Sequence, residues 1–316
     1  MKSKRLIMSE HKGHEQVEHV NDMVDYISNL PDCILHHILS FMHTQEVVKT
    51  SILSTRWKNL WTSIPNIYFD DDLLCPEVTS FKNFVEGVLR SRDSSDIIKF
   101  SLSCCVFCDA SQIHSWISYA IMHNVQELDL CLMEVDPFVI PSCMFNNKSL
   151  EILNIQMHWV ELPSHISLPC LKTLHLSIVE FLDDDYAEKL FSGCPVLENL
   201  VLSDCMWMYL ENILISSPSL KNLIINDKSL FGPLDDFGGC KIKIDAENLT
   251  NFEYTGYLSN EILLNNTSYL VKACIHVSPP PIWEKEVACR VVELLKQLQN
   301  VISLRLSNCT MEVKFL

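Results

Sequence analysis

The sequence predicts an α/β protein: a small N-terminal unit of three helices, followed by a solenoid of repeats whose parallel strands line the concave face. Two patterns and the composition predict this fold. Apolar residues between positions 26 and 61 recur at helical spacing, and from residue 97 onward they recur with period two inside a longer repeat. Hydrophobic residues make up 48% of the chain and charged residues 20%, which provides enough apolar material for a core.

The same patterns divide the 316 residues into a tail, a helical unit, a connector and the solenoid. Residues 1–24 are polar and rich in histidine, which predicts a disordered tail. We expect the helical unit over residues 25–70, a helical connector over residues 71–96 and the solenoid over residues 97–316.

In the helical unit, Pro31 is expected to open the first helix, where a missing N–H costs nothing. Thr44 and Ser54 are expected to cap the second and third helices. A unit this small has difficulty burying all its apolar surface alone, so we expect it to dock on another protein. The second helix is expected to bury Val47, Val48, Ile52 and Leu53, and the third carries Trp57, Leu60 and Trp61.

The runs LPDCILHHILSFM (30–42) and EVVKTSILSTRWKNLW (46–61) resemble a plant F-box over its full length. The resemblance implies docking on a Skp-type adaptor and, through that adaptor, on a cullin scaffold. Some of the apolar residues must instead hold the helices together, and Leu60 and Trp61 fit internal packing better than adaptor contact. By position, the adaptor contacts would be Leu30, Pro31, Ile34, Leu35, Ile38, Leu39, Val47, Val48, Ser54, Arg56 and Trp57.

The rest of the chain repeats a Leu-x-x-Leu-x-Leu pattern, mostly at the ~20–29-residue intervals of leucine-rich repeats. Three copies, LPCLKTLHL, CPVLENLVL and SPSLKNLII, place a proline just before the predicted strand. The leucines point inward from short strands, helical material before each proline closes the outer side, and neighbouring copies share one core. The copies begin at Ile97, Val125, Leu150, Leu171, Leu197, Leu220, Leu249, Leu270 and Val301.

The outward positions of these strands form a row that is mostly polar and uncharged, with an acid at each end. This row either solvates the inner surface or forms the footprint of a partner protein, and the sequence favours neither. The candidate substrate face consists of Glu127, Asp129, Asn154, Thr173, His175, Asn199, Asn222 and Glu253.

The order of an F-box, repeats and a Pro-rich block, HVSPPPIWEKEV (276–287), resembles plant F-box/leucine-rich-repeat proteins of the FBD-containing type. The resemblance implies a non-catalytic substrate receptor of an SCF-type cullin ubiquitin ligase that binds an unknown target protein. Members of that family continue with further repeats and often an FBD segment, which we expect this chain to lack because it stops at Leu316. The alternative is an interaction scaffold without ligase activity, or a truncated, inactive paralogue.

Charge and hydropathy argue against several classes of partner. The net charge of −16 repels nucleic acid and anionic membranes. No run approaches the ~18 apolar residues of a membrane span, and the N-terminus lacks a signal peptide, so we expect the nucleus, the cytoplasm or both. In those compartments most of the 14 cysteines would be reduced thiols packed as small apolar groups.

The sequence shows no catalytic motif, and we expect no metal and no cofactor. The C-x-x-C of Cys105 and Cys108 lacks a second pair of ligands, so packed cysteines are favoured over zinc. The aspartate runs 70–72 and 183–185 fit solvated loops better than a cation site. A pocket for a phosphate ligand is disfavoured because the repeat region holds only two arginines, Arg290 and Arg305.

Overall fold

The computed structural model describes residues 26–27, 29–71, 78–104, 109–133, 138–158, 160–163, 165–181, 183–207, 210–228, 240–278 and 285–312. The predicted tail (1–24) and the prolines of the 276–287 block lie outside these residues.

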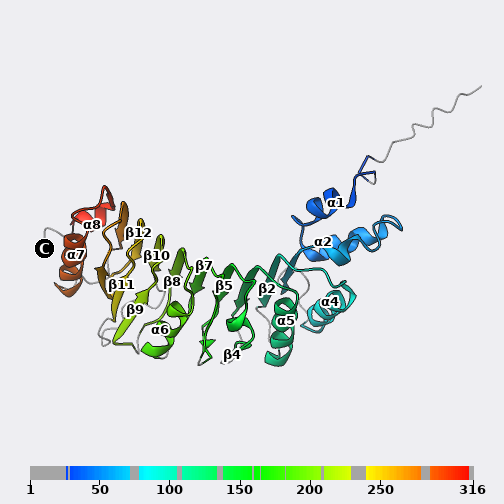
Figure 1. Ribbon diagram of the computed structural model, residues 1–316, viewed down its shortest axis with the longest axis horizontal. Helices are drawn as coiled ribbons and strands as arrows, with labels where there is room; N and C mark the ends of the chain where they lie inside the picture. The colour runs from blue at the N-terminus through cyan, green and yellow to red at the C-terminus, as the bar shows by residue number, and fades with distance from the viewer. Residues whose placement is uncertain are drawn as a thin grey trace, which may run out of the picture.

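Ten strands pair in parallel into one sheet, and together they form an arc (Figure 1). Each of the nine predicted repeat patterns becomes one of these strands, which confirms the solenoid. The strands, in sheet order, are β1 (Asn66–Asp70), β2 (Lys99–Cys104), β3 (Glu127–Leu132), β5 (Ile152–Gln156), β7 (Thr173–Ser177), β8 (Asn199–Ser203), β10 (Asn222–Asp227), β12 (Asn251–Gly256), β14 (Lys272–Val277) and β15 (Ser303–Leu306).

The sheet begins before the predicted boundary at residue 97. Strand β1 lies inside the range predicted for the helical unit, and its Ile67 and Phe69 are buried in the solenoid core. Helix α4 (Val78–Ser91), predicted as a connector, packs Phe81 and Val85 into that same core. The leucine pattern does not predict β1, because β1 reads NIYFD, which alternates with period two but contains no leucine.

Two kinds of structure cover the outer face. Helices α4, α5 (Ala110–Met122) and α6 (Asp184–Ser192) lie along the first part of the sheet (Figure 1). Farther along, β9 (Asn212–Ser216), β11 (Lys241–Asp245) and β13 (Glu261–Asn265) form a second parallel sheet instead. The expectation of helical outer segments is therefore wrong for these repeats, since NILIS and KIKID alternate as strands do.

The shorter elements complete the outer side and the far end. A two-stranded pair joins β4 (Phe138–Val139) and β6 (Val160–Glu161), and a 3-10 turn, η3, spans Met144–Asn146. Helices α7 (Lys285–Gln297) and α8 (Asn308–Glu312) lie at the C-terminal end of the arc (Figure 1).

The core of the solenoid is continuous from Ile67 to Leu298. In-register pairing stacks equivalent leucines on successive strands, so Leu153 pairs with Leu174, and Leu200 with Leu223. All four are fully buried. Burial of one such side chain contributes about 1.5–3 kcal/mol relative to exposure, so the stacked leucines dominate the stability of the repeats.

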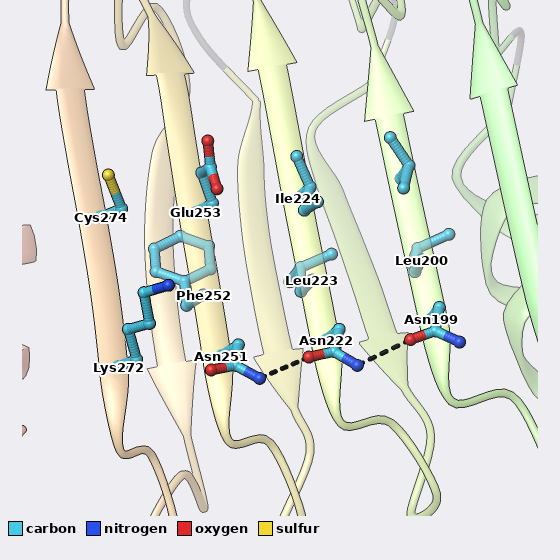
Figure 2. Close-up of a pocket in the computed structure, with 11 residues that line it drawn as sticks. Asn199, Leu200, Asn222, Leu223, Ile224, Asn251, Phe252, Glu253, Lys272 and Cys274 are labelled. Carbon is cyan, nitrogen blue, oxygen red and sulfur yellow. Dashed lines mark hydrogen bonds between the residues drawn. The ribbon is translucent and has the colours of Figure 1, made fainter.

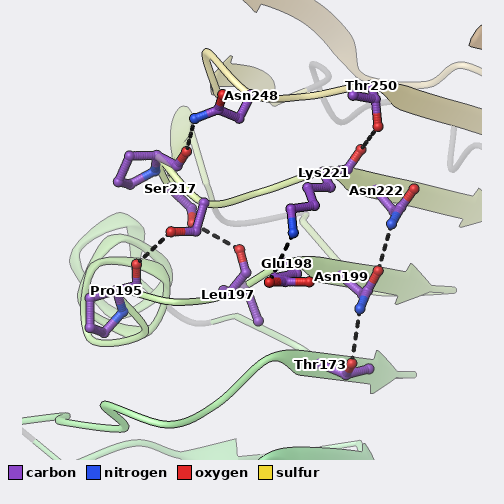
Figure 3. Close-up of polar contacts among 12 residues, drawn as sticks. Thr173, Pro195, Leu197, Glu198, Asn199, Ser217, Lys221, Asn222, Asn248 and Thr250 are labelled. Carbon is purple, nitrogen blue, oxygen red and sulfur yellow. Dashed lines mark hydrogen bonds and ion pairs between the residues drawn. The ribbon is translucent and has the colours of Figure 1, made fainter. Parts of the chain in front are cut away.

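Polar contacts between repeats align the chain just before each strand (Figure 3). The Lys221 ammonium lies 3.0 Å from the Glu198 carboxylate, and Ser217 Oγ donates to the Leu197 carbonyl at 3.3 Å. Asn248 Nδ2 donates to the carbonyl of Pro218 at 2.7 Å, so the proline that restarts the extended chain also anchors the next repeat.

The helical unit has a small core of its own. It contains α1 (Asp32–Leu39), α2 (Thr44–Lys49) and two 3-10 turns, η1 (Thr50–Ile52) and η2 (Leu60–Ser63). The predicted third α-helix is wrong, because residues 55–59 form turns and η2 is a short 3-10 helix. The extended Ile64 ends η2 directly before Pro65, as the residue preceding a proline tends to do. The core residues are Leu35, Leu39, Val47, Trp57, Leu60 and Ile64.

The helical unit is attached to the first strand of the sheet. Trp61 packs against both cores. Thr44 is the first residue of α2 rather than its predicted cap, and its Oγ1 accepts a hydrogen bond from the backbone N–H of Tyr68 at 2.8 Å. The buried Arg92 donates to the carbonyl of Ile64, and burial lowers the pKa of its guanidinium. These contacts fix the helical unit at the β1 end of the solenoid.

Gly256, at the end of β12, is required by its backbone. Its φ is +154°, and a Cβ there would lie 2.1 Å from the carbonyl oxygen of Asp227 on the neighbouring strand. Gly87 in α4 is different, because a Cβ there meets no atom within 4 Å.

We predict that Gly256→Ala destabilises the protein and that Gly87→Ala, the matched control, stabilises it. Gly256→Ala adds a steric clash to a strained φ, at a cost of more than about 1 kcal/mol, whereas alanine in a helix gains about 0.5–1 kcal/mol over glycine. Urea unfolding followed by circular dichroism measures both midpoints. Equal midpoints for Gly256→Ala and wild type would contradict the conclusion that the backbone at position 256 requires glycine.

Candidate functional site

The first candidate surface is the outside of the helical unit. The predicted adaptor contacts divide into two groups. Pro31, Ile34, Ile38, Ser54 and Arg56 are exposed, so they are available to a partner. Leu35 is fully buried, and the helical core also contains Leu39, Val47 and Trp57, while Leu30 and Val48 are partly buried against the two cores.

Arg56 has an internal role. Its guanidinium forms an ion pair with Asp32 at 2.5 Å and donates to the carbonyl of Leu30. These contacts clamp the turn after η1 to the start of α1. A partner at this position would meet a pre-formed ion pair rather than a free cation.

Three exposed apolar side chains were missed as candidate contacts. Phe41 is 76% exposed, Ile52 86% and Leu53 63%. The prediction that Ile52 and Leu53 are buried is wrong, because α2 ends at Lys49 and the tighter winding of the 3-10 turn changes the direction of the following side chains. Phe41 carried a signal in the sequence, since it follows Ile34 and Ile38 at helical spacing.

We define the exposed apolar group of the helical unit as Ile34, Ile38, Phe41, Ile52 and Leu53. Side chains of this size exposed together on a small unit are typical of an interaction surface. The buried residues complete the unit's core without them, so the group is free to contact a partner.

The second candidate surface is the concave face of the ten-stranded sheet. All eight predicted substrate-face residues lie on it, in two rows that the strand register defines. The first row contains Glu127, Thr173, Asn199 and Asn222, and the second contains Asp129, Asn154, His175 and Glu253. Their role in binding stays a prediction.

Hydrogen-bonded amides join four strands along the first row. Asn251 Nδ2 donates to Asn222 Oδ1 at 2.5 Å, Asn222 Nδ2 to Asn199 Oδ1 at 2.7 Å, and Asn199 Nδ2 to Thr173 Oγ1 at 3.1 Å (Figures 2 and 3). We call these four residues the amide row. Its signal in the sequence is the asparagine at the same position in LENL, LKNL and LTNF.

Beside the amide row lies a hollow of about 390 Å³ across β8, β10, β12 and β14 (Figure 2). The half-buried aliphatic side chains of Val201 and Ile224 line it next to the amides. Glu253 and Lys272 line its far side. The hollow therefore offers an apolar surface with hydrogen-bonding groups on one side and charges at the end.

The β1–β3 end of the face is acidic. Glu127 pairs with Lys99 at 2.5 Å, whereas Asp129 accepts a hydrogen bond from Ser101 Oγ at 3.4 Å. Burial raises the pKa of the Cys131 thiol, and the nearby Asp129 carboxylate raises it further. Desolvation lowers the pKa of His175, which favours the neutral ring.

The other residues considered as cation ligands in the sequence include the aspartate run 183–185, and two of these aspartates have structural roles. Asp183 caps α6 by accepting from the N–H of Asp185 at 2.8 Å, and Asp184 accepts from the N–H of Glu211 at 3.2 Å. Over the described part of the chain, no group of three or more His, Cys, Asp or Glu is placed to hold a metal ion. Cys105 and Cys108 lie outside those residues. None of the described helices has the length and apolar composition needed to cross a bilayer.

One buried carboxyl group has a strongly shifted pKa. Asp227, at the end of β10, has a pKa raised to about 6, mainly by burial and also by repulsion from Asp204. The Tyr254 hydroxyl donates to Asp227 Oδ2 at 3.4 Å and accepts from the Leu258 N–H at 2.6 Å. Asp227 and Tyr254 are both buried inside the solenoid, so the shifted pKa acts on stability.

Comparison with known protein families gives separate matches for the helical unit and for the solenoid. Residues 27–68 match the F-box domain, and residues 113–236 match the leucine-rich repeats of the FBD-associated F-box protein At5g56370.

Relatives from Arabidopsis thaliana match most of the chain. The F-box/LRR-repeat protein At4g14103 is 33% identical over 92% of this chain and 79% of its own length. The F-box/LRR-repeat protein At4g14096 is 32% identical over 92% of this chain and 63% of its own length. The putative F-box/FBD/LRR-repeat protein At3g59240 is 36% identical over 79% of this chain and 51% of its own length. This chain thus spans less than two thirds of the length of several curated relatives.

We predict that Asp227 makes the stability of the protein fall as the pH rises through about 6. The folded pKa of about 6 lies above the ordinary aspartate pKa of 3.8, so the folded state holds the proton more tightly between these pH values. The stabilisation is complete below pH 4 and is lost above pH 6, with a slope of up to about 1.4 kcal/mol per pH unit.

Urea unfolding from pH 4.5 to 7.5 tests this. Asp227→Asn should remove the slope that Asp227 contributes, and Glu247→Gln, at an exposed carboxylate, should leave the profile as in wild type. An Asp227→Asn profile parallel to wild type would show that Asp227 does not titrate in this range.

Proposed function

Because the chain belongs to the family of plant F-box/leucine-rich-repeat proteins, we propose that it is the target-recognising subunit of an SCF-type cullin ubiquitin ligase. The helical unit binds a Skp-type adaptor, and the adaptor connects the chain to a cullin. The concave face of the solenoid receives the target protein. The chain itself forms and breaks no bond, and it acts in the nucleus, the cytoplasm or both.

The observation that carries the proposal is the exposed apolar group of the helical unit. Ile52 is 86% exposed although it lies within a unit that has a complete core of its own. Water contact of these side chains is unfavourable, and burial against an adaptor removes it. The match of residues 27–68 to the F-box supports the identity of the adaptor.

The attachment of the helical unit to the sheet supports the second part of the proposal. A receptor raises the local concentration of its target beside the ligase and holds it in one orientation. The contacts of Thr44 with Tyr68 and of Arg92 with Ile64 transmit that orientation from the adaptor to the concave face.

We predict that Phe41→Asp and Ile52→Asp each weaken adaptor binding by more than tenfold, because each places a charge in a desolvated interface. Both positions are exposed in the free protein, so thermal unfolding should not change. The matched control is Tyr269→Asp, which changes a 66% exposed side chain on the solenoid. Leu35 is unsuitable for this test, since Leu35→Asp buries a carboxylate in the helical core.

Binding of purified full-length variants to a purified Skp-type adaptor by isothermal titration calorimetry measures the effect. If both variants bound the adaptor with wild-type affinity, the exposed apolar group would not be the docking surface. No binding by the wild type would overturn the proposed function.

A second measurement separates a receptor from a scaffold. Affinity capture of the chain from cells with and without proteasome inhibition, followed by mass spectrometry, should give partners that accumulate under inhibition. Partners whose abundance does not depend on the chain or on the proteasome would favour the scaffold.

A further inference from the structure

The concave face carries a line of residues that differ in chemistry from one end to the other. The strand register places Asp129, Val201, Ile224 and Arg305 in the same row across the sheet, on β3, β8, β10 and β15. The line begins with an acid at β3, is aliphatic in the middle, and reaches the basic Arg305 at β15 after a second acid, Glu253, on β12. We call it the recognition line.

The charges at the two ends are available to a partner. Arg305, in the line, and Lys272, in the adjacent row that contains Asn251, lie on adjacent strands and are exposed. Neither forms an ion pair with any residue that the structure describes. Glu253, which lies in the line itself on β12, offsets one of these two cations. This leaves one net positive charge at this end, in a protein whose net charge is −16. Asp129, at the opposite end, also forms no ion pair with any residue that the structure describes.

The middle of the line favours a polypeptide main chain. Val201 and Ile224 pair in the strand register and form an apolar surface. Ile224 lies beside the three asparagines of the amide row (Figure 2). Asn199 and Asn222 each use one amide hydrogen on a neighbour and keep a second, whereas Asn251 donates its second to Thr250 Oγ1 at 3.2 Å. The carbonyl oxygens of all three keep a free lone pair for a further hydrogen bond. An extended segment can therefore place an apolar side chain on the aliphatic surface while its peptide groups bond the amides.

The length of the line sets the length of the segment. Seven strand-to-strand steps separate β3 from β15 in the sheet order. At about 4.8 Å a step the line is about 34 Å long, which an extended chain covers with about ten residues. The aliphatic pair lies near the middle of that distance.

We propose that the recognition line binds an extended segment of about ten residues of the target protein. The segment carries a basic side chain at one end, over Asp129, an apolar side chain in the middle, over Val201 and Ile224, and an acidic side chain at the other end, over Lys272 and Arg305. This inference rests on the proposed function, since it names the chemistry of the target that the concave face receives.

Selection of random twelve-residue peptides displayed on phage, with the full-length chain as bait, tests the inference. The enriched peptides should share a basic end, an apolar centre and an acidic end. The best of them, synthesised with a fluorescent label, is then titrated against variants by fluorescence anisotropy. Asp129→Lys, Arg305→Glu and Ile224→Asp should each weaken binding at least tenfold, and the control Lys148→Glu, at an exposed residue before β5, should change it less than twofold.

Charge reversal gives the sharpest comparison. The double variant Asp129→Lys with Arg305→Glu should bind a peptide with its two end charges exchanged better than it binds the selected peptide. The inference falls if the enriched peptides show no charge separation, if no peptide is enriched, or if Asp129→Lys and Arg305→Glu bind as wild type does. Adaptor binding by the same samples separates the two claims, because intact adaptor binding with failed peptide selection overturns only the recognition line.

Discussion

In-register parallel pairing of ten strands is the constraint on which the rest of the structure depends. Because side chains alternate across a strand, the register sends every inner leucine into one core and every intervening residue to the concave face. A slip of one residue in any strand would exchange these two sets. The pairing therefore fixes the core, the amide row and the recognition line together, and Gly256 permits the close approach of β12 to β10 at one end.

The sequence predicts this sheet well because leucine spacing and strand period are local properties. Leu174, Leu200 and Leu223 each lie in a pattern that is complete within a few residues. The outer face is harder to predict, since nothing in the leucine pattern distinguishes the helix α6 from the strand β9. The leucine pattern does not predict the first strand of the sheet, because β1 has isoleucine and phenylalanine at its two inner positions and no leucine.

The candidate docking surface could be predicted only in part. Helical spacing identifies an apolar stripe but does not say which of its members face the unit's own core and which face solvent. Leu35 and Ile34 are neighbours in the sequence, yet the first is fully buried and the second is exposed. The apolar spacing wrongly predicts that Ile52 and Leu53 are buried, because the change from α to 3-10 winding after Lys49 has no marker in the sequence. The predicted substrate-face residues do lie on the concave face, since period two leaves no such choice, and their role in binding stays a prediction. The hydrogen bonds of the amide row could not be predicted, because they depend on the register between strands.

The two surfaces use separate parts of the chain, and Trp61, Thr44 and Arg92 hold them in one geometry. Binding at the helical unit should therefore leave the sheet unchanged. Amide hydrogen exchange of the full-length chain, measured by mass spectrometry with and without a purified Skp-type adaptor, tests this separation most directly. The account predicts slower exchange upon adaptor binding over residues 34–41 and 50–53 and unchanged exchange in the strands of the concave sheet. Protection confined to those strands, with none in the helical unit, would contradict it.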